Sequence, residues 1–399
     1  MIKKKHLIFC LIITVIITGM LTFIITNYIS LIIGNKAVIT KSDYQILQDS
    51  KKLLTLKKYI DKNYLEPVDS QILMEGAAKG LFHSLGDPYS IYMNKEEFKD
   101  FKESTSGIYG GIGVIITELD GYVTVVAPIE DTPGDRAGLK TGDRIIKVDD
   151  VEITGIGLEK ATSMMKGKKG TKVIITIIRE SKKEPIDVEI KREEIILKTV
   201  KTDMIDNSIA YVRISMFDQD TGKEFKKALK EIESRNAKGL ILDLRQNPGG
   251  YVTQCVDVAD ELLDKGIIFY TEDKARNRDI TYSKDNKINI PYVLLVDGGS
   301  ASASEIVAGA IKDRKAGIII GEKTFGKGLV QTVEKLYDGS GFKLTTQKYY
   351  TPNGISINKI GIEPDIEVPA LEESDIQGIG EIKDVQLERA VEEILKMIE

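Results

Sequence analysis

The spacing of apolar positions changes along the chain, and each change predicts a different kind of structure. The first apolar stretch, residues 7–33, is interrupted only by small or uncharged polar residues. It is longer than the roughly 20 residues that a helix needs to cross a bilayer. We therefore expect a retained transmembrane helix, which we favour over a cleaved signal peptide because no small-x-small cleavage site is evident.

Three lysines, at positions 3–5, precede this apolar stretch. Positive charge beside a membrane span favours the cytoplasmic side of the membrane. The pattern predicts a cytoplasmic stub over residues 1–6, a single-pass anchor in the cell membrane over residues 7–33, and a folded part that lies outside the cytoplasm.

Over residues 36–104 the apolar side chains recur at helical spacing, with lysines between them. A helix is expected to begin at the cap Asp69 and to end before the Gly-Asp-Pro sequence at residues 86–88. This part of the chain is predicted to be a helical N-terminal region. His83 lies at the end of that helix, and we interpret it as a cation near a helix C-terminus rather than as a catalytic base.

Residues 105–194 change again, to short apolar runs typical of strands, with one helix expected over residues 158–165. From residue 195 to about 370, strands and helices alternate. Buried strands are expected over residues 239–244 and 291–296, and each leads into a loop that opens a helix. This alternation predicts an α/β core, in which functional groups gather at the carboxyl ends of the strands.

Residues 371–399 are predicted to form a C-terminal helical region, with one amphipathic helix over residues 384–397. Its apolar side could pack on the core or on a second subunit, so a homodimer is possible.

The composition narrows the chemistry. The net charge of −5 over 399 residues gives no reason to expect nucleic acid as a partner. The chain has two histidines and two cysteines, with neither a CxxC sequence nor a histidine cluster, so we expect no metal site, no cofactor and no disulfide. If a serine is the nucleophile in this chain, its general base is therefore expected to be a lysine rather than a histidine.

Two loops could supply that pair. Residues 300–305, Ser-Ala-Ser-Ala-Ser-Glu, follow a predicted buried strand and open a helix whose free amides could stabilise an oxyanion. On these residues alone, a capping box between Ser302 and Glu305 is the favoured interpretation.

Lys327 lies between two glycines in an apolar segment. Burial would lower its pKa, but exposure in a hairpin is equally compatible with the pattern. Gln331 could hold the lysine amine without adding charge.

Residues 105–194 resemble a PDZ domain. The resemblance rests on Gly-Gly-Ile-Gly-Val at residues 110–114, Ala-Gly-Leu-Lys-x-Gly-Asp at residues 137–143, and Gly-x-x-Gly-Thr at residues 167–171. It implies an inserted mixed α/β domain that binds free C-termini of peptides by strand addition. The terminal carboxylate would be held by four residues of the glycine loop, namely Gly111, Ile112, Gly113 and Val114. The alternative is that these glycines only turn the chain.

Four further motifs are similar to those of the carboxyl-terminal processing proteases, which are tail-specific Ser/Lys peptidases. They are Leu-Asp-Leu-Arg-x-Asn-x-Gly-Gly at residues 242–250, the serine loop, Phe-Gly-Lys-Gly-x-Val-Gln at residues 325–331, and Gly-Asp-Pro-Tyr at residues 86–89. The resemblance covers roughly residues 40–399. It implies a peptidase core of crotonase-like α/β type over residues 195–370 and a PDZ domain that gates the protease.

The same resemblance implies roles for individual residues. Ser302 matches the nucleophile, Lys327 the general base and Gln331 the residue that orients the lysine. The backbone amides of Gly250 and Ala303 match the oxyanion hole. Asp313 matches an acidic position with a supporting role.

These assignments imply a membrane-bound serine endopeptidase that acts on proteins or peptides with free C-termini, through an acyl-enzyme, in processing or quality control of envelope proteins. One alternative is a catalytically inactive, membrane-tethered PDZ scaffold that only binds C-termini. Another is an acyl-CoA enzyme, because the crotonase type also uses two amides as its oxyanion hole. The presence of both Ser302 and Lys327 argues against the first alternative, and the anchor and peptide-binding domain argue against the second.

Overall fold

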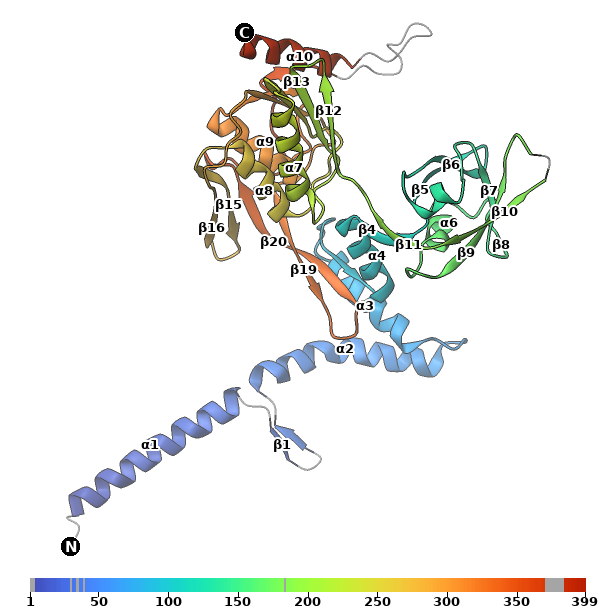
Figure 1. Ribbon diagram of the computed structural model, residues 1–399. Helices are drawn as coiled ribbons and strands as arrows, with labels where there is room; N and C mark the ends of the chain where they lie inside the picture. The colour runs from blue at the N-terminus through green and yellow to red at the C-terminus, as the bar shows by residue number, and fades with distance from the viewer. Residues whose placement is uncertain (1–3, 29–30, 34–35, 39, 183, 370–383) are drawn as a thin grey trace. The chain divides into compact units, whose positions relative to one another are not determined.

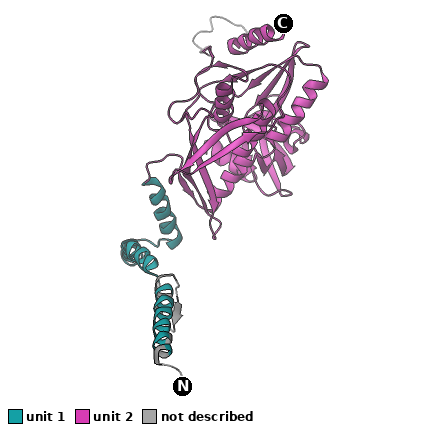
Figure 2. Cartoon of the chain, turned by 90° about the vertical axis from the view of Figure 1, so that its left-hand side faces the viewer, with its two compact units in different colours: residues 1–84 teal, residues 85–399 magenta. Residues whose placement is uncertain are grey.

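A computed structural model of the protein describes residues 4–28, 31–33, 36–38, 40–182, 184–369 and 384–399. The chain divides into two compact units, residues 1–84 and residues 85–399 (Figure 2). All candidate catalytic residues fall in the second unit.

The first unit is mainly helical. Its elements are α1 (Lys4–Tyr28), β1 (Leu31–Ile33), β2 (Lys36–Val38), α2 (Lys41–Asn63) and α3 (Ser70–His83). The predicted cap Asp69 accepts the backbone N–H of Gln71 at 2.8 Å, and Thr40 caps α2 in the same way.

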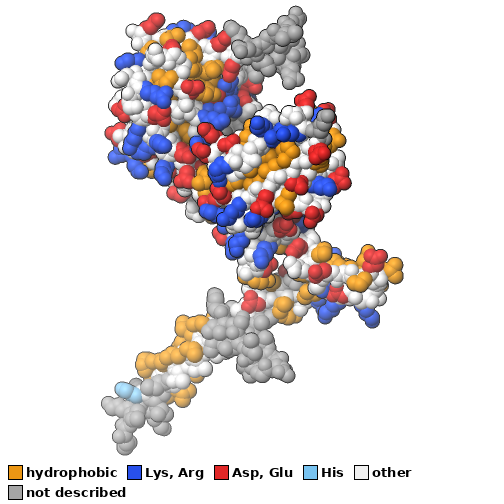
Figure 3. All heavy atoms as spheres, turned by 45° about the vertical axis from the view of Figure 1, so that its right-hand side comes forward, with side chains coloured by type: hydrophobic (Ala, Val, Ile, Leu, Met, Phe, Trp, Pro, Cys, Tyr) orange, Lys and Arg blue, Asp and Glu red, His pale blue; other side chains and the backbone are white. Residues whose placement is uncertain are grey.

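The helix α1 covers most of the predicted transmembrane span, and its described side chains are largely apolar and exposed (Figure 3). Within the described ranges, however, no helix is long and apolar enough to cross a membrane. The predicted membrane anchor over residues 7–33 is therefore not supported by the structure.

A five-stranded antiparallel sheet with one extra short strand builds the domain between residues 112 and 192. The strand order is β10-β9-β7-β6-β5, and β8 pairs with β7. Its elements are β5 (Val114–Leu119), β6 (Tyr122–Pro128), α5 (Pro133–Arg136), β7 (Arg144–Val148), β8 (Val151–Glu152), α6 (Leu158–Met165), β9 (Lys172–Ile178) and β10 (Ile186–Lys191). Alternate residues of these strands, such as Ile145, Ile175 and Ile177, are fully buried in one apolar core.

The strands on either side of this domain pair with each other. β4 (Ile108–Gly111) follows α4 (Lys95–Ser106), and β11 (Glu193–Ile196) follows β10. β4 and β11 are antiparallel neighbours, with Gly111 opposite Glu193 and Ile108 opposite Ile196. The domain is thus an insertion whose two ends lie side by side (Figure 1).

A six-stranded sheet in the order β12-β13-β14-β17-β18-β21 forms the centre of the α/β core, and all its neighbours except β12 and β13 are parallel. Its strands are β12 (Val200–Ile205), β13 (Ile209–Ile214), β14 (Gly239–Asp243), β17 (Tyr292–Val296), β18 (Ile318–Gly321) and β21 (Ile366–Glu367). Every residue of β14 and β17 is buried, as expected for central strands that are covered on both faces.

Helices cover both faces of this sheet. Ala210, Val212 and Ile214 of β13 pack in the same core as α7 (Thr221–Ser234), α8 (Val252–Leu262) and α9 (Ala303–Arg314). Ile209, on the opposite face, packs with Ala390 and Ile394 of α10 (Val385–Ile398). The predicted C-terminal helix therefore packs on the core, while residues 370–383 lie outside the described residues.

A second, antiparallel sheet in the order β16-β15-β20-β19 was not predicted from the sequence. It consists of β15 (Gly266–Asp273), β16 (Arg278–Ser283), β19 (Leu329–Lys335) and β20 (Gly341–Tyr350), and β3 (Ile91–Met93) also pairs with β20. This sheet is important for the site because β19 begins two residues after Lys327.

Candidate active site

Ser302 lies at the turn between the buried strand β17 and the helix α9. It is the N-cap of α9, and its φ of 55° lies in the left-handed region that residues other than glycine adopt rarely. Such backbone strain is concentrated at functional positions of proteins. The first-turn amides of α9 are next to this serine, as the sequence predicted.

The structure distinguishes the three serines of this loop. Ser300 and Ser304 are fully buried, and each hydroxyl donates to a backbone carbonyl of the neighbouring loop, Ser300 to Leu244 at 2.8 Å and Ser304 to Asn247 at 2.9 Å. Ser302 is only partly buried. The two outer serines therefore connect loops, and Ser302 is the serine that a substrate can reach.

The loop after β14 lies against the serine loop. Asn247 accepts the backbone N–H of Ala301 at 3.0 Å. A Cβ atom added to Gly249, whose φ is 102°, would lie 2.9 Å from Ser302 Cβ and 3.0 Å from the Ala303 nitrogen. Only glycine fits this contact, because any larger residue would push the two loops apart.

This contact brings together the two amides that were predicted to form an oxyanion hole. Within the described residues, neither the Gly250 N–H nor the Ala303 N–H donates to a protein acceptor. Gly250 has a φ of 144°, and a Cβ there would meet the Phe217 carbonyl oxygen at 2.0 Å. Two free donors on adjoining loops can bind a developing negative charge.

Glu305 joins the serine loop to the lysine loop. Its carboxylate is fully buried. Oε2 accepts the backbone N–H of Ser302 and that of Lys327, each at 2.8 Å, and Oε1 accepts the Gly326 N–H at 2.7 Å and the Thr324 hydroxyl at 2.6 Å. The capping interaction predicted from the sequence is therefore present, and the same side chain also holds Lys327.

Tyr349, on β20, makes a second connection between these residues. Its hydroxyl lies 3.0 Å from the Ser302 carbonyl oxygen and 2.5 Å from that of Lys327, and it shares its proton between them. Burial raises the pKa of this hydroxyl well above its ordinary value, and the Glu305 carboxylate adds to the rise. Tyr349 therefore stays protonated and remains a donor.

Lys327 is half-buried, and the net effect of its surroundings is to lower the pKa of its amine. Burial is the largest effect that lowers the pKa of Lys327, and the charge of Lys343 lowers it further, whereas Glu305 and Asp87 act in the opposite direction. The Nζ atom lies 4.8 Å from the centre of the Tyr89 ring. In the part of the chain that the structure describes, no hydrogen bond joins this atom to Ser302 or Gln331.

Gln331 and Asp313 have other partners. The Gln331 side chain donates to the Leu329 carbonyl at 3.1 Å. Asp313 lies in the last turn of α9, ten residues after Ala303, which places it about 15 Å along the helix from the serine. Its carboxylate accepts the Asn353 N–H at 2.7 Å. Asp313 thus holds the loop after β20 and is not brought to the serine.

The glycine loop of the inserted domain is tightly held. Ile112 is buried, its carbonyl accepts the Gly134 N–H, and the Gly113 carbonyl accepts the Thr132 hydroxyl at 2.8 Å. Because a trans peptide bond points its N–H away from its C=O, the amides of Gly113 and Val114 face away from these partners. Gly111 ends β4, and the Val114 side chain packs against the core of the domain.

Three parts of the chain match known families. Residues 208–368 match peptidase family S41, residues 110–190 match the PDZ domain, and residues 16–97 match the activating protease CtpB N-terminal domain. The chain is 39% identical to the carboxy-terminal processing protease CtpA of Bacillus subtilis over 369 residues, which cover 92% of this chain and 77% of that protein. This chain belongs to peptidase family S41, the carboxy-terminal processing proteases.

Further comparisons agree. The chain is 39% identical to a carboxy-terminal-processing protease of Bartonella bacilliformis, over 85% of this chain and 79% of that protein. The fold is similar to that of the photosystem II D1 C-terminal processing protease, with a TM-score of 0.50 and 29% identity over 83% of this chain and 94% of that chain. A putative S41 protease from Bacteroides fragilis, at 14% identity and a TM-score of 0.51 over 85% and 96% of the two chains, shows the fold alone.

The family resemblance seen in the sequence is therefore confirmed. The protein is a serine protease of the carboxy-terminal processing type, with a PDZ domain and a mixed α/β structure, and it binds peptide or protein substrates.

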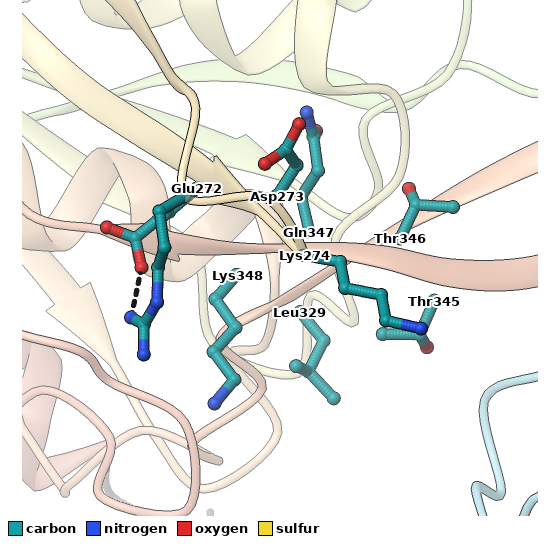
Figure 4. A pocket seen from close by; sticks show the side chains of 9 residues that line it. Glu272, Asp273, Lys274, Leu329, Thr345, Thr346, Gln347 and Lys348 are labelled. Carbon is teal, nitrogen blue, oxygen red and sulfur yellow. Dashed lines mark hydrogen bonds and ion pairs between the residues drawn. The ribbon is translucent and has the colours of Figure 1, made fainter.

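A pocket of about 300 Å³ lies in the second sheet (Figure 4). It is lined by the end of β15, the start of β19 at Leu329, and the middle of β20. The ion pair between Glu272 and Arg276 lies at one side of it, and Lys274 extends toward Thr345. Neither Ser302 nor Lys327 lines this pocket; its lining includes Leu329, the first residue of β19, two positions after Lys327.

The sequence did not predict the roles of Tyr349 and Tyr89. Both are tyrosines far from Ser302 along the chain, and neither stands in a pattern that predicts contact with a catalytic loop. Tyr89 does belong to the Gly-Asp-Pro-Tyr motif, which was the only sign available that this segment has a function beyond ending a helix.

Proposed function

We propose that the protein is a serine endopeptidase that recognises the C-termini of its substrates through the PDZ domain and cleaves them with a Ser302/Lys327 dyad. The observation that supports this most strongly is the shared support of the two residues. One buried carboxylate, Glu305, and one buried hydroxyl, Tyr349, bind the backbone of both.

The reaction begins with proton transfer. Neutral Lys327 takes the hydroxyl proton of Ser302 while the oxygen attacks the peptide carbonyl. A lysine with an ordinary pKa of about 10.4 would be almost fully protonated at neutral pH. The burial that lowers the pKa of Lys327 increases the fraction of the enzyme that holds a usable base.

The tetrahedral intermediate carries a negative oxygen, which the free amides of Gly250 and Ala303 bind. Protonated Lys327 then donates its proton to the leaving amine, and the acyl group remains on Ser302. A water molecule, deprotonated by the same lysine, hydrolyses the ester and regenerates the enzyme. Gln331 orients the lysine in this proposal through its amide oxygen, because its nitrogen already donates to Leu329.

The PDZ domain selects the substrate. The outward amides of Gly113 and Val114 are suited to bind a terminal carboxylate, and β5, which follows them, offers an edge for strand addition. We propose processing or quality control of envelope proteins as the cellular role, based on the family resemblance.

The test is cleavage of an unfolded protein by the full chain and by three variants. Ser302→Ala and Lys327→Ala should each lower kcat/KM by at least about 10⁴-fold while the folded fraction is unchanged. Lys323→Ala is the matched control, because Lys323 lies four residues away, is exposed and pairs with Glu363. It should retain normal activity.

A covalent acyl-enzyme gives a second readout. A slowly hydrolysed peptide ester should add its acyl mass to Ser302 in the native enzyme and add nothing to Ser302→Ala. Normal turnover in either dyad variant would refute the dyad. Normal peptide binding without any turnover in the native protein would instead favour an inactive scaffold.

A further inference from the structure

The Gly-Asp-Pro-Tyr segment at residues 86–89 is not explained by the reaction described above. It lies between α3 and β3. The segment belongs to the second compact unit, which also contains the peptidase core, whereas α3 belongs to the first unit. β3 pairs with the far end of β20, so that Met93 is opposite Gly341 and Ile91 is opposite Lys343. The segment is thus attached to the strand that also carries Tyr349.

Hydrogen bonds fix the segment on β20. Asp87 accepts the Tyr89 N–H at 3.0 Å and the Ser90 hydroxyl at 2.5 Å. The buried Ser90 in turn accepts the Thr345 N–H at 2.9 Å, at a point of β20 that lies between its pairings with β3 and β15. The backbone at residue 89 is therefore held firmly, which fixes the position from which the tyrosine ring extends.

The ring of Tyr89 lies over the amine of Lys327, with 4.8 Å between Nζ and the ring centre. Three charged groups also affect the pKa of this amine. They are Glu305 on α9, Asp87 in the Gly-Asp-Pro-Tyr segment, and Lys343 on β20. Tyr89 is the aromatic group in contact with the amine, and it carries no charge of its own.

We propose that Tyr89 is a positioning residue of the peptidase, whose ring covers the Lys327 amine and sets the pH range in which this lysine works as a base. The proposal rests on the proposed function of Lys327. It assigns a task to the Gly-Asp-Pro-Tyr segment, namely to hold this ring in place.

The ring has two opposite effects on the amine. It excludes water, which favours the neutral amine. The negative face of the ring also attracts the ammonium form, which favours the charged state. Leucine at this position would keep most of the water exclusion and lose the attraction. Alanine would lose both, and the entry of water should be the larger effect, because burial is the largest of the effects that lower the pKa of Lys327.

The two substitutions should therefore move the pH profile in opposite directions. The rising limb of kcat/KM against pH reports the pKa of the base in the free enzyme. In Tyr89→Leu this limb should shift to lower pH by about half a unit to one unit, as expected from a lost cation–π contact. In Tyr89→Ala it should shift to higher pH. Tyr89→Phe keeps the ring face and should leave the limb within about 0.3 units of the native position.

The experiment uses the full chain and a peptide substrate, with Tyr92→Leu as the matched control. Tyr92 lies three residues further on, in β3, and is also partly buried, so its substitution should leave the limb in place. A ¹⁵N NMR titration of the lysine amines in the Ser302→Ala background measures the same pKa without turnover, so a variant with reduced activity remains informative.

Opposite shifts in the Leu and Ala variants, seen by either method, would support the proposal. Shifts in the same direction, or no shift in either variant, would overturn it. The proposed function fails on a different result, namely continued cleavage by Ser302→Ala or Lys327→Ala, so the two failures are distinguishable.

Discussion

Ser302 and Lys327 donate their backbone N–H groups to the same oxygen atom, Oε2 of Glu305, each over 2.8 Å. The two residues are 25 positions apart in the sequence, and a single buried carboxylate fixes the distance between their backbones. The Tyr349 hydroxyl, which donates to the carbonyls of the same two residues, supports this arrangement from the other side of the backbone.

Substitution of Glu305 by glutamine should damage both stability and catalysis. An amide cannot accept the four hydrogen bonds that the carboxylate accepts, and each buried donor left without a partner costs about 1–3 kcal/mol. We expect the free energy of unfolding, measured by urea denaturation, to fall by about 3 kcal/mol or more.

The same variant makes a second prediction, about pH. Glu305 raises the pKa of Lys327, so removal of its charge should move the rising limb of the activity profile to lower pH. Glu334→Gln is the control, because Glu334 is exposed on β19; it should change neither quantity. An unchanged unfolding free energy in Glu305→Gln would contradict the role assigned to this carboxylate.

Substitution of Tyr349 by phenylalanine removes only the hydroxyl that lies between the carbonyls of Ser302 and Lys327. Since a buried acceptor that loses its donor costs about 1–3 kcal/mol, the unfolding free energy should fall by that amount, and kcat should fall with it. Tyr350→Phe is the control, because the Tyr350 ring stacks on Tyr270 at 5.0 Å and its substitution preserves the ring. Equal effects of the two substitutions on the unfolding free energy and on kcat would contradict the role assigned to the Tyr349 hydroxyl.

Lys343 should tune the base through its charge. Burial lowers the pKa of Lys327 most, and Lys343 lowers it further because two like charges repel. Replacement of Lys343 by methionine should therefore raise the pKa of Lys327 and move the rising limb of kcat/KM to higher pH. The exposed Lys335, substituted in the same way, should leave the limb unchanged. A shift to lower pH in Lys343→Met would refute this electrostatic account.

Gly249 should tolerate no side chain. In Gly249→Ala the new methyl group would lie within about 3 Å of Ser302 Cβ and the Ala303 nitrogen, so the oxyanion donors must separate. A lost donor typically lowers kcat by about 10²–10³-fold. Gly298→Ala provides the comparison, since a Cβ there meets nothing within 4 Å. Similar kcat values for the two variants would contradict the assignment of the Gly250 and Ala303 amides as the oxyanion hole.

Peptide recognition by the PDZ domain can be tested with two glycines of similar conformation. Gly113 and Gly121 have φ values of 73° and 77°, but a Cβ would clash with Thr132 only at Gly113, where the separation would be 2.3 Å. Gly113→Ala should therefore abolish binding of a peptide with a free C-terminus in calorimetry. Gly121→Ala should bind normally and lose only about 1–2 kcal/mol of stability. Binding of the amidated peptide as tightly as the free acid would refute carboxylate recognition.

The regular parts of the fold could be predicted from the sequence, because the periods of 2 and 3.6 in apolar positions directly reflect burial. The buried strands β14 and β17 and the helix α10 are examples. The hairpin of β19 and β20 was missed, because many of its residues are half-exposed and polar, which weakens the alternation.

The site was predictable only where its chemistry is local in sequence. Ser302 and Glu305 lie within four residues, so their capping interaction could be inferred from the sequence, and the structure confirms it. The Ala303 amide as an oxyanion donor stays a prediction. The contact of Tyr89 with Lys327 spans 238 positions and depends on how β3 pairs with β20. No local pattern encodes such a contact, because it exists only in the folded chain.

The antiparallel pairing of β4 with β11 has a practical consequence. The polypeptide leaves for the PDZ domain and returns from it at two hydrogen-bonded neighbours, Gly111 and Glu193. A foreign ligand-binding domain whose own termini are adjacent could replace residues 112–192 without rerouting the remaining backbone. The inserted domain can thus be exchanged while the peptidase core is kept, and such grafts offer a route to proteases with new substrate specificity.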